Sequence, residues 1–357
     1  MHKHKQSQCK RKVKHRKNVM GLIIFCITVC IVFMFAYYQN LRKEISVRQE
    51  WLETVLTREK KWILENQGPE GEIYMNGSKA GDVNPYFACM AALGLLAETK
   101  NCPMTETEQK AVGRYLDWHT GVLLETDGKM GIYRKEGGEL IYKEKADSED
   151  GYLGMYLFLM GKYLEKTEST DLPESWKNGI SLALKKIQSL MQDGITQVSE
   201  ENTTVYLMDN LEVWKGLYEL ELAGLEDTQA ISEIRKKIQK QIEKIFWDDA
   251  NQRWRIIGNS DRYHQTEFYP DGVAQIYPLI YEFPVKERKK QKVLYDQFTE
   301  RFQWQKLNKK RTGFLWAMTG MAAAQMRDIN NLVELVGNYE TEYCKKRKYP
   351  LYTGEAG

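Results

Sequence analysis

Histidine, cysteine and proline are scarce in this sequence of 357 residues, which contains 5 His, 6 Cys and 8 Pro. Beyond residue 40 the only histidines are His119 and His264, and no His or Cys has the spacing of a zinc site. Cys89, Cys102 and Cys344 are too few and too widely spaced for a disulfide framework. We therefore expect no metal and no other cofactor, and we expect Cys89, which lies in an apolar run, to be a small buried residue.

Basic residues are concentrated at the N-terminus. Residues 1–18 contain eight Lys or Arg, three His and no acid. The remainder holds 44 basic and 49 acidic residues, so its net charge is −5, whereas that of the whole chain is +3. This balance argues against a nucleic-acid surface, which requires a positive potential. It also gives no general attraction for a long acidic substrate.

Charged side chains are absent from residues 19–38, VMGLIIFCITVCIVFMFAYY. In a helix that rises about 1.5 Å per residue, some twenty apolar residues cross a hydrocarbon core of roughly 30 Å. A signal peptide has a shorter apolar core and a small-residue cleavage site. The sequence Ala36-Tyr37-Tyr38 is a poor cleavage site but suits the aromatic belt of a membrane interface. We therefore expect an uncleaved transmembrane helix whose partner is the lipid bilayer.

The distribution of charge also predicts an orientation in the membrane. By the positive-inside rule, residues 1–18 form a cytoplasmic tail, and such a basic tail also contacts anionic lipid. Residues 39–50 are a linker or an extension of the membrane helix, and residues 51–357 form a domain on the outer side. The expected protein is a single-pass protein of the cell membrane with its functional domain outside the cell.

A short pattern recurs along this outer domain at intervals of 60, 63, 60 and 59 residues. Each copy has a turn signal followed by a brief β-like run, and such regular spacing is typical of repeat architectures. The copies are Gly71–Tyr74, Gly131–Tyr133, Gly194–Thr196, Trp254–Ile257 and Gly313–Trp316.

The segments after these copies are apolar around most of a helix, which is typical of helices buried on most sides. They are residues 84–98, 150–165, 206–221, 269–283 and 315–328. Charged helices with one apolar face lie between them, at residues 105–120, 173–192, 227–246 and 285–303.

Alternating outer and inner helices favour an all-α fold, the (α/α)6 toroid of helical hairpins with short β-hairpin loops. A solenoid is the alternative, but the repeat is longer than the usual helical repeats. A sixth hairpin would need an inner helix after residues 329–346, so the last hairpin is expected to be incomplete, or the chain is truncated.

Five phrases carry a resemblance to a known family: WILENQGPEGEIYMN (62–76), NPYFACMAALGLL (84–96), ADSEDGYLGMYLFLM (146–160), MDNLEVWKGL (208–217) and FYPDGVAQIYPLI (268–280). They are similar to the six-hairpin glycosidase superfamily over about residues 50–357. Residues 146–150 are distantly similar to the Asp-rich active-site signature of glycoside hydrolase family eight. The resemblance implies an (α/α)6 toroid that acts on carbohydrate.

Carboxylates near the N-terminal ends of inner helices would converge at one mouth of such a toroid. Glycoside cleavage needs two carboxyl groups, one as an acid and one as a base or nucleophile. We predict that these come from Asp150, Asp209 and Asp271. Asn84, Asp147 and Asn210 are further polar candidates for binding the substrate. A structural alternative exists because Asp and Asn are also preferred helix N-caps.

Aromatic residues are the expected sugar-binding surface, since a pyranose ring stacks on an aromatic face. Tyr and Trp, with 21 and 9 residues, outnumber the 11 Phe, which favours amphipathic aromatic surface. The candidates near the proposed mouth are Tyr86, Tyr152, Trp214, Tyr269 and Trp316. Each of them alone is also compatible with a core position.

These observations predict a membrane-anchored, extracellular glycosidase acting on a poly- or oligosaccharide. The alternative is a non-catalytic glycan-binding or polysaccharide-export accessory protein on the same scaffold, because a fold does not fix a function. A polysaccharide lyase is disfavoured by the shortage of His, and a prenyl or lanthionine cyclase by the absence of zinc ligands.

Overall fold

The computed structural model describes residues 46–77, 81–137, 139–169, 171–225, 228–258, 267–285, 288–307 and 316–344, together with residues 39, 356 and 357. The chain divides into two compact units, Met1–Val55 and Leu56–Gly357. The expected cytoplasmic tail and transmembrane helix, residues 1–38, lie outside the described part. Within the described part, no helix is both long enough and apolar enough to span a membrane.

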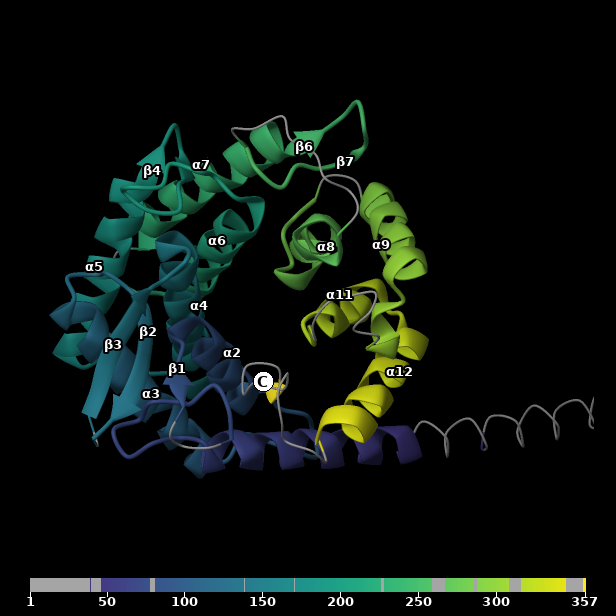
Figure 1. Cartoon of the computed structure of the whole chain (residues 1–357), viewed down its shortest axis with the longest axis horizontal. Helices are drawn as coiled ribbons and strands as arrows, with labels where there is room; N and C mark the ends of the chain where they lie inside the picture. The colour runs from purple at the N-terminus through teal and green to yellow at the C-terminus, as the bar shows by residue number, and fades with distance from the viewer. Residues whose placement is uncertain are drawn as a thin grey trace, which may run out of the picture. The chain divides into compact units, whose positions relative to one another are not determined.

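The second unit consists of inner and outer helices that alternate along the chain (Figure 1). After helical residues 46–65, the inner helices are α2 (Pro85–Leu96), α4 (Glu149–Thr167), α6 (Leu207–Leu222), α8 (Val273–Ile280) and α11 (Thr319–Met326). The outer helices are α3 (Glu106–Glu125), α5 (Glu174–Leu190), α7 (Thr228–Phe246), α9 (Arg288–Phe302) and α12 (Ile329–Tyr339). The alternation predicted from the repeat is therefore confirmed for the described residues.

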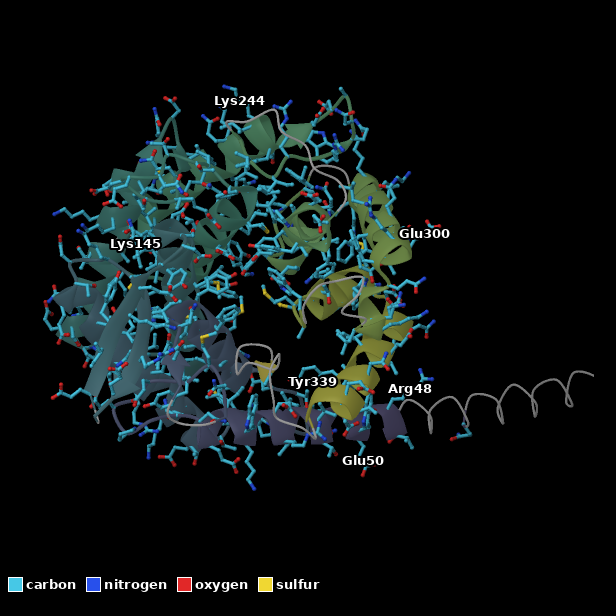
Figure 2. All side chains as sticks on the ribbon, in the orientation of Figure 1. Arg48, Glu50, Lys145, Lys244, Glu300 and Tyr339 are labelled. Carbon is cyan, nitrogen blue, oxygen red and sulfur yellow. The ribbon has the colours of Figure 1, made fainter. Side chains whose placement is uncertain are left out.

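Burial explains why the two sets of helices differ in sequence. Every residue from Asp150 to Gly161 of inner helix α4 is buried, so no face of that stretch needs to be polar. In outer helix α7 the buried residues follow a helical stripe, Ile231, Ile234, Ile238, Ile242 and Phe246. Lys244 of the same helix lies at the outer edge of the unit (Figure 2).

Short strands connect outer helices to the inner helices that follow them. Strands β1 (Asp82–Val83), β2 (Gly131–Glu136) and β3 (Glu139–Lys145) form one antiparallel sheet. Strands β4 (Met191–Gln192) and β5 (Ile195–Thr196) pair before α6, and β6 (Trp247–Asp248) and β7 (Arg253–Trp254) pair before α8. Three of the recurring β-like runs thus lie in hairpins, whereas the run at residues 71–74 makes only an isolated bridge between Gln67 and Ile73.

Two inner helices begin later than their sequence patterns predict. Tyr269 is extended, with φ −122° and ψ 134°, because the following Pro270 disfavours helical conformation before it. The chain makes a wide turn, η1 (Phe268–Gly272), and α8 starts only at Val273. Helix α11 starts at Thr319, so Trp316 precedes it. A short turn, η2 (Trp304–Lys306), follows α9, and η3 (Glu340–Cys344) follows α12. Residues 345–355, where the last hairpin was expected to be incomplete, lie outside the described part.

Helices α4 and α6 pack in direct backbone contact because glycines face each other across them. A β-carbon on Gly154 would lie 2.6 Å from the backbone nitrogen of Val213 and 2.7 Å from the carbonyl carbon of Glu212. A β-carbon on Gly216 would lie 2.3 Å from the carbonyl oxygen of Gly154. No L side chain fits at such distances, so glycine at these positions sets the separation of the two helices.

Replacing Gly154 with Ala should therefore destabilise the protein, although Ala is the better helix former. We expect the free energy of unfolding to fall by about 1–3 kcal/mol, the usual range for overpacking. The matched control is Gly121→Ala in α3, where a β-carbon meets no atom within 4 Å, and where Ala should add about 0.5–1 kcal/mol. Urea unfolding of the purified full chain measures the free energy of unfolding of both variants. If Gly154→Ala and Gly121→Ala change it by the same amount, the backbone contact between α4 and α6 at Gly154 is contradicted.

Candidate active site

The first turn of α4 and the first two turns of α6 bring three carboxyl groups together. Asp150 comes from α4, and Asp209 and Glu212 come from α6. Gly151 marks their proximity: an ideal β-carbon there would lie 2.7 Å from Glu212 Oε2 and 3.6 Å from Asp209 Oδ1. These two oxygens are therefore no more than roughly 6 Å apart, close enough for their charges to interact strongly.

Asp150 is completely buried and is held by hydroxyl and amide donors. Ser148 Oγ lies 2.8 Å from Asp150 Oδ1, Thr196 Oγ1 lies 2.7 Å from Asp150 Oδ2, and the Gly151 amide donates to Oδ1 at 3.0 Å. These bonds favour the charged form, but burial outweighs them and raises the pKa of Asp150 to about 6.

The contacts of Thr196 explain how a protonated Asp150 is accommodated. Thr196 Oγ1 also lies 2.8 Å from Oδ1 of Asn210, so its single hydroxyl proton faces two acceptors. The orientation of Asn210 is fixed, because its Nδ2 donates to the carbonyls of Thr196 and Tyr206, both at 2.9 Å, while Oδ1 accepts the Thr196 amide at 2.9 Å. When Thr196 donates to Asn210, the proton between Thr196 and Asp150 belongs to Asp150. Asn210, a predicted substrate ligand, thus has its amide occupied by protein groups.

Asp209 is the most solvent-accessible of the three carboxyl groups, and it is half-buried. Burial raises the pKa of Asp209 well above its usual range, and the neighbouring charges of Asp150 and Glu212 raise it further. No described Lys or Arg forms an ion pair with any of the three carboxyl groups. Like charges this close cannot all ionise near neutral pH, so the cluster retains protons.

Glu212 is the hub of the inner helices. It is 2% exposed, and its Oε1 accepts hydrogen bonds from Tyr86 of α2 at 2.5 Å and from Tyr277 of α8 at 2.8 Å. The hydroxyl of Tyr281 lies at 3.3 Å. Burial is the largest effect on Glu212 and raises its pKa to about 7, although the phenol donors oppose the rise. The pKa values of these tyrosines are themselves raised by burial beside Glu212, so they remain hydrogen-bond donors.

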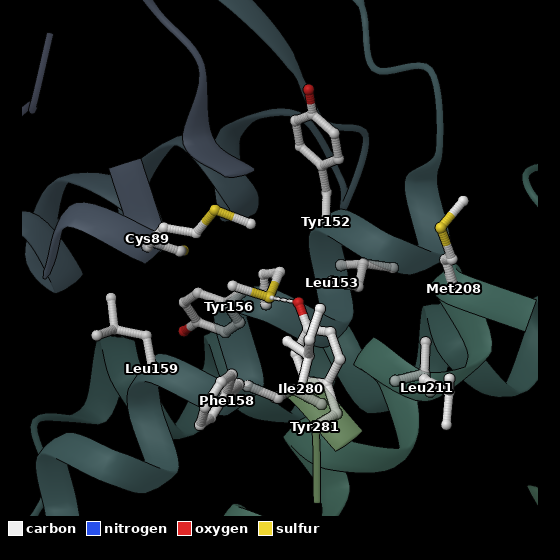
Figure 3. Close-up of a cluster of buried hydrophobic side chains, with 14 of the residues drawn as sticks. Cys89, Tyr152, Leu153, Tyr156, Phe158, Leu159, Met208, Leu211, Ile280 and Tyr281 are labelled. Atoms are coloured by element: carbon white, nitrogen blue, oxygen red, sulfur yellow. Dashed lines mark hydrogen bonds between the residues drawn. The ribbon is translucent and has the colours of Figure 1, made fainter. Parts of the chain in front are cut away.

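A layer of buried side chains supports the cluster from within (Figure 3). In this view Tyr156, Phe158 and Ile280 pack around Tyr281, whose hydroxyl also reaches the sulfur of Met155 at 3.5 Å. Tyr152 points away from this layer, on the same side as Met208 at the start of α6. The carboxyl groups are thus fixed by rigid, fully packed helices.

Four predicted substrate ligands lie near the starts of α2 and α4. Asp147 is exposed just before the helix, and its charge helps to raise the pKa of Tyr152, after burial as the main cause. The rings of Tyr152 and Tyr86 are 5.6 Å apart. Asn84 caps α2, because its Oδ1 accepts the amide of Tyr86 at 2.9 Å. The capping alternative therefore applies to Asn84.

Tyr269 and Trp316 form an aromatic pair beside the cluster, although they are far apart in sequence. Their ring centroids are 4.9 Å apart at 32°, and Tyr269 is 42% exposed. Burial is the main cause of the raised pKa of Tyr269. The negative charge of Asp209 has the next largest effect. Trp214 is not part of this surface, because it is buried between α6 and α7, stacked on Tyr218 and bonded to Gln239.

Asp271 lies in a different environment from Asp150 and Asp209. Its Oδ2 accepts the amide of Glu267 at 3.3 Å, and its side chain lines a cavity of about 270 Å³ beside α9, together with Gln297 and Arg301. The structure thus brings two of the three predicted catalytic carboxyl groups together with Glu212, which the sequence prediction omitted. Its signal was available, since Glu212 follows Asp209 by three residues within an apolar helix.

The described residues contain no group of three or more His, Cys, Asp and Glu arranged to hold a metal ion. His119 and Cys89 instead belong to a buried polar contact, with Nδ1 of His119 3.6 Å from the Cys89 sulfur and 3.2 Å from the Tyr115 hydroxyl. Burial lowers the pKa of His119 to about 3, so its imidazole is neutral.

No family model matches the chain, and no curated protein matches it in sequence. Several solved structures share its fold. A wild-type glycosidase is 12% identical over 86% of this chain and 89% of its own, with a TM-score of 0.59. A rhamnosidase from Klebsiella oxytoca with rhamnose bound is 10% identical over 82% of this chain and 55% of its own, with a TM-score of 0.52.

A D-mannose isomerase is similar at 12% identity, over 82% of this chain and 85% of its own, with a TM-score of 0.51. At such low identities the likeness shows the fold alone. The chain therefore shares the mostly helical fold of these structures, which is consistent with the (α/α)6 toroid that the resemblance implied. Its relation to glycoside hydrolase family eight stays a prediction.

The carboxyl cluster should make the protein less stable as the pH rises. Buried neutral His119 has the opposite pH dependence, so the prediction concerns the contribution of the cluster. Asp150 and Glu212 bind protons more tightly folded than unfolded, so their contribution to the free energy of unfolding should fall between about pH 4 and 7. Each group contributes roughly 3 kcal/mol to this loss. Asp150→Asn, which keeps the shape and removes the titration, should flatten the pH dependence and stabilise the protein at pH 8.

Urea unfolding of the full chain at several pH values measures this effect. Glu65→Gln serves as the control, because Glu65 is an exposed carboxyl group and its removal should leave the pH dependence unchanged. If Asp150→Asn is no more stable relative to wild type at pH 8 than at pH 5, the buried protonated cluster is refuted, because the contributions of His119 and the other titrating groups cancel in that comparison.

Proposed function

We propose that this protein is a glycoside hydrolase that acts on a poly- or oligosaccharide outside the cell while its N-terminal helix anchors it in the cell membrane. The observation that carries the proposal is the crowding of Asp150, Asp209 and Glu212 next to exposed Asp147 and a partly exposed aromatic pair. The glycosidase scaffold supports it. Among proteins with that scaffold, one solved glycosidase holds glucose and a rhamnosidase holds rhamnose.

Asp209 is the proposed general acid. Its neighbours and its burial keep it protonated, and it is the most accessible group of the cluster. A carboxylic acid with a raised pKa is what protonation of a leaving oxygen requires. Asp150 and Glu212 are buried, so in this proposal they set the protonation of Asp209 and do not touch the sugar.

Asp147 is the proposed base or nucleophile, a stronger role than the sugar binding expected from the sequence. It is exposed immediately before α4, and the positive end of the helix dipole favours a carboxylate there. Its charge influences Asp209, Tyr152 and Tyr269, so these side chains lie near Asp147. Tyr269 and Trp316 would offer the stacking surface.

Asp209→Asn and Asp147→Asn should each reduce glycoside cleavage by about 10²–10⁴-fold, the usual contribution of one acid or base group. Asp271→Asn should retain activity within a factor of a few, because Asp271 lines a separate cavity. The measurement is release of reducing ends from a panel of polysaccharides and oligosaccharides by the full chain. Loss of activity in Asp271→Asn with retention in Asp209→Asn would reverse the assignment.

The same screen distinguishes hydrolysis from the alternative function. A glycan that binds the wild type without any release of reducing ends would favour a non-catalytic glycan-binding protein. Activity that falls as the pH rises through the raised pKa of Asp209 would support its role as the acid.

The membrane anchor has its own test. The full chain should stay in the membrane pellet after an alkaline carbonate wash, and protease added outside intact cells should digest the domain of residues 51–357. Ile27→Asp with Ile31→Asp should release the chain, since each charge at a helix centre costs roughly 3 kcal/mol of insertion free energy. Protection of the domain from external protease would refute the proposed orientation.

A further inference from the structure

A second cavity is lined by residues of the outer helices α7 and α9 and of the β6–β7 hairpin, and by no residue of the carboxyl cluster. Figure 1 shows where these elements lie. Its volume is about 270 Å³. Two tryptophans that pair across the hairpin, Trp247 and Trp254, form its aromatic wall. The polar groups around them are Glu243, Asp249, Lys290 and Gln291.

Both indoles are held rigidly. Trp247 Nε1 donates to Asp249 Oδ1 at 2.8 Å, and Trp254 Nε1 donates to Gln291 Oε1 at 3.1 Å. The two rings meet edge to face, with centroids 5.1 Å apart at 70°. Trp254 is 4% exposed and belongs to the core, whereas Trp247 is only partly buried. A large aromatic ring fixed in a partly open position is preorganised for binding.

The chemistry of the cavity matches a sugar ring without charge. The indole of Trp247 offers an apolar face for the C–H groups of a pyranose. The carboxylates of Glu243 and Asp249 and the Lys290 ammonium, which lies over the Trp247 ring at 5.6 Å from its centre and 3.9 Å from Asp249, provide acceptors and donors for hydroxyl groups. The Gln291 amide is already bonded to Trp254 and to the carbonyl of Gln275. The cavity contains two acidic side chains, Glu243 and Asp249, and one basic side chain, Lys290, so its net negative charge disfavours an anionic sugar.

The hairpin also joins this cavity to the carboxyl cluster. The Leu207 amide donates to the carbonyl of Ile256 at 2.9 Å, and the Gly258 amide donates to that of Val205 at 2.8 Å. The chain after Trp254 is thus paired with the segment that leads directly into α6 and Asp209. The hairpin, like β2–β3 and β4–β5, lies at the end of the unit where the inner helices begin.

We propose that this cavity is a second saccharide-binding site, which holds one neutral pyranose ring of a glycan chain against Trp247. It is separate from the carboxyl cluster, so its existence does not depend on hydrolysis there.

Binding is measured by calorimetry on the full chain carrying Asp209→Asn, which prevents turnover. The probes are cello-, xylo-, manno-, malto- and N-acetylchitohexaose, with hexagalacturonate as the anionic comparison. At least one neutral hexasaccharide should bind, and Trp247→Ala should weaken that binding at least about tenfold, as for a typical tryptophan hot spot. Hexagalacturonate should bind at least tenfold more weakly than the best neutral probe.

Trp247→Phe keeps a stacking ring and should weaken binding less than threefold. Trp51→Ala removes a partly buried tryptophan of the first unit and should leave binding unchanged. Thermal unfolding of each variant identifies any loss of folding. If Trp247→Ala does not fold, Lys290→Met takes its place as the test, because it leaves Trp247 intact and should also weaken binding. Unchanged binding in folded Trp247→Ala, or no binding of any neutral probe, would overturn the proposal.

Two further results separate this site from the proposed hydrolysis. Cleavage of an aryl monosaccharide, too short to span both sites, should be the same in Trp247→Ala as in wild type. If no glycan is cleaved by the wild type but Trp247→Ala still loses hexasaccharide binding, the hydrolase proposal fails and the second site stands.

Discussion

The contact between α4 and α6 is the constraint on which the site depends. Gly154 and Gly216 allow the two helix backbones to touch, and that contact places the first turns of both helices side by side. Asp150 and Asp209 are therefore neighbours although 59 residues separate them, and Glu212 joins them one helical turn further along. A larger residue at either glycine would separate the carboxyl groups as well as the helices, so stability and chemistry depend on the same contact.

In the part of the chain that the structure describes, these acids are accommodated by hydroxyl groups and not by cations. Ser148 and Thr196 serve Asp150, and tyrosines of α2 and α8 converge on Glu212. Hydroxyl groups can donate or accept, so they tolerate a carboxyl group in either protonation state, whereas an ion pair with Lys or Arg would fix the charge. Such surroundings suit a group that must hold and release a proton, at the expense of stability at high pH.

Periodicity made most of the fold predictable, because a buried helix and an exposed helix require different residue patterns. The stripe of α7 and the continuous apolar run of α4 both gave the correct elements. The starts of α8 and α11 were predicted too early, since apolar character alone does not show that Pro270 keeps Tyr269 extended. In the site, Asp150 and Asp209 were predicted from their position at helix starts, but Glu212 was missed because it lies one turn inside its helix.

The sequence by itself determined the alternation of inner and outer helices, the positions of acids near the helix starts and the absence of disulfide and zinc patterns. Only the tertiary structure decided which of these residues meet. In that structure Glu212 lies beside the aspartates, and Asn84 is the N-cap of α2. Trp214 is buried between α6 and α7, and Asp271 lines another cavity. The physical reason is that a residue pattern fixes which face of a helix is buried, whereas the packing of particular side chains fixes what that face touches.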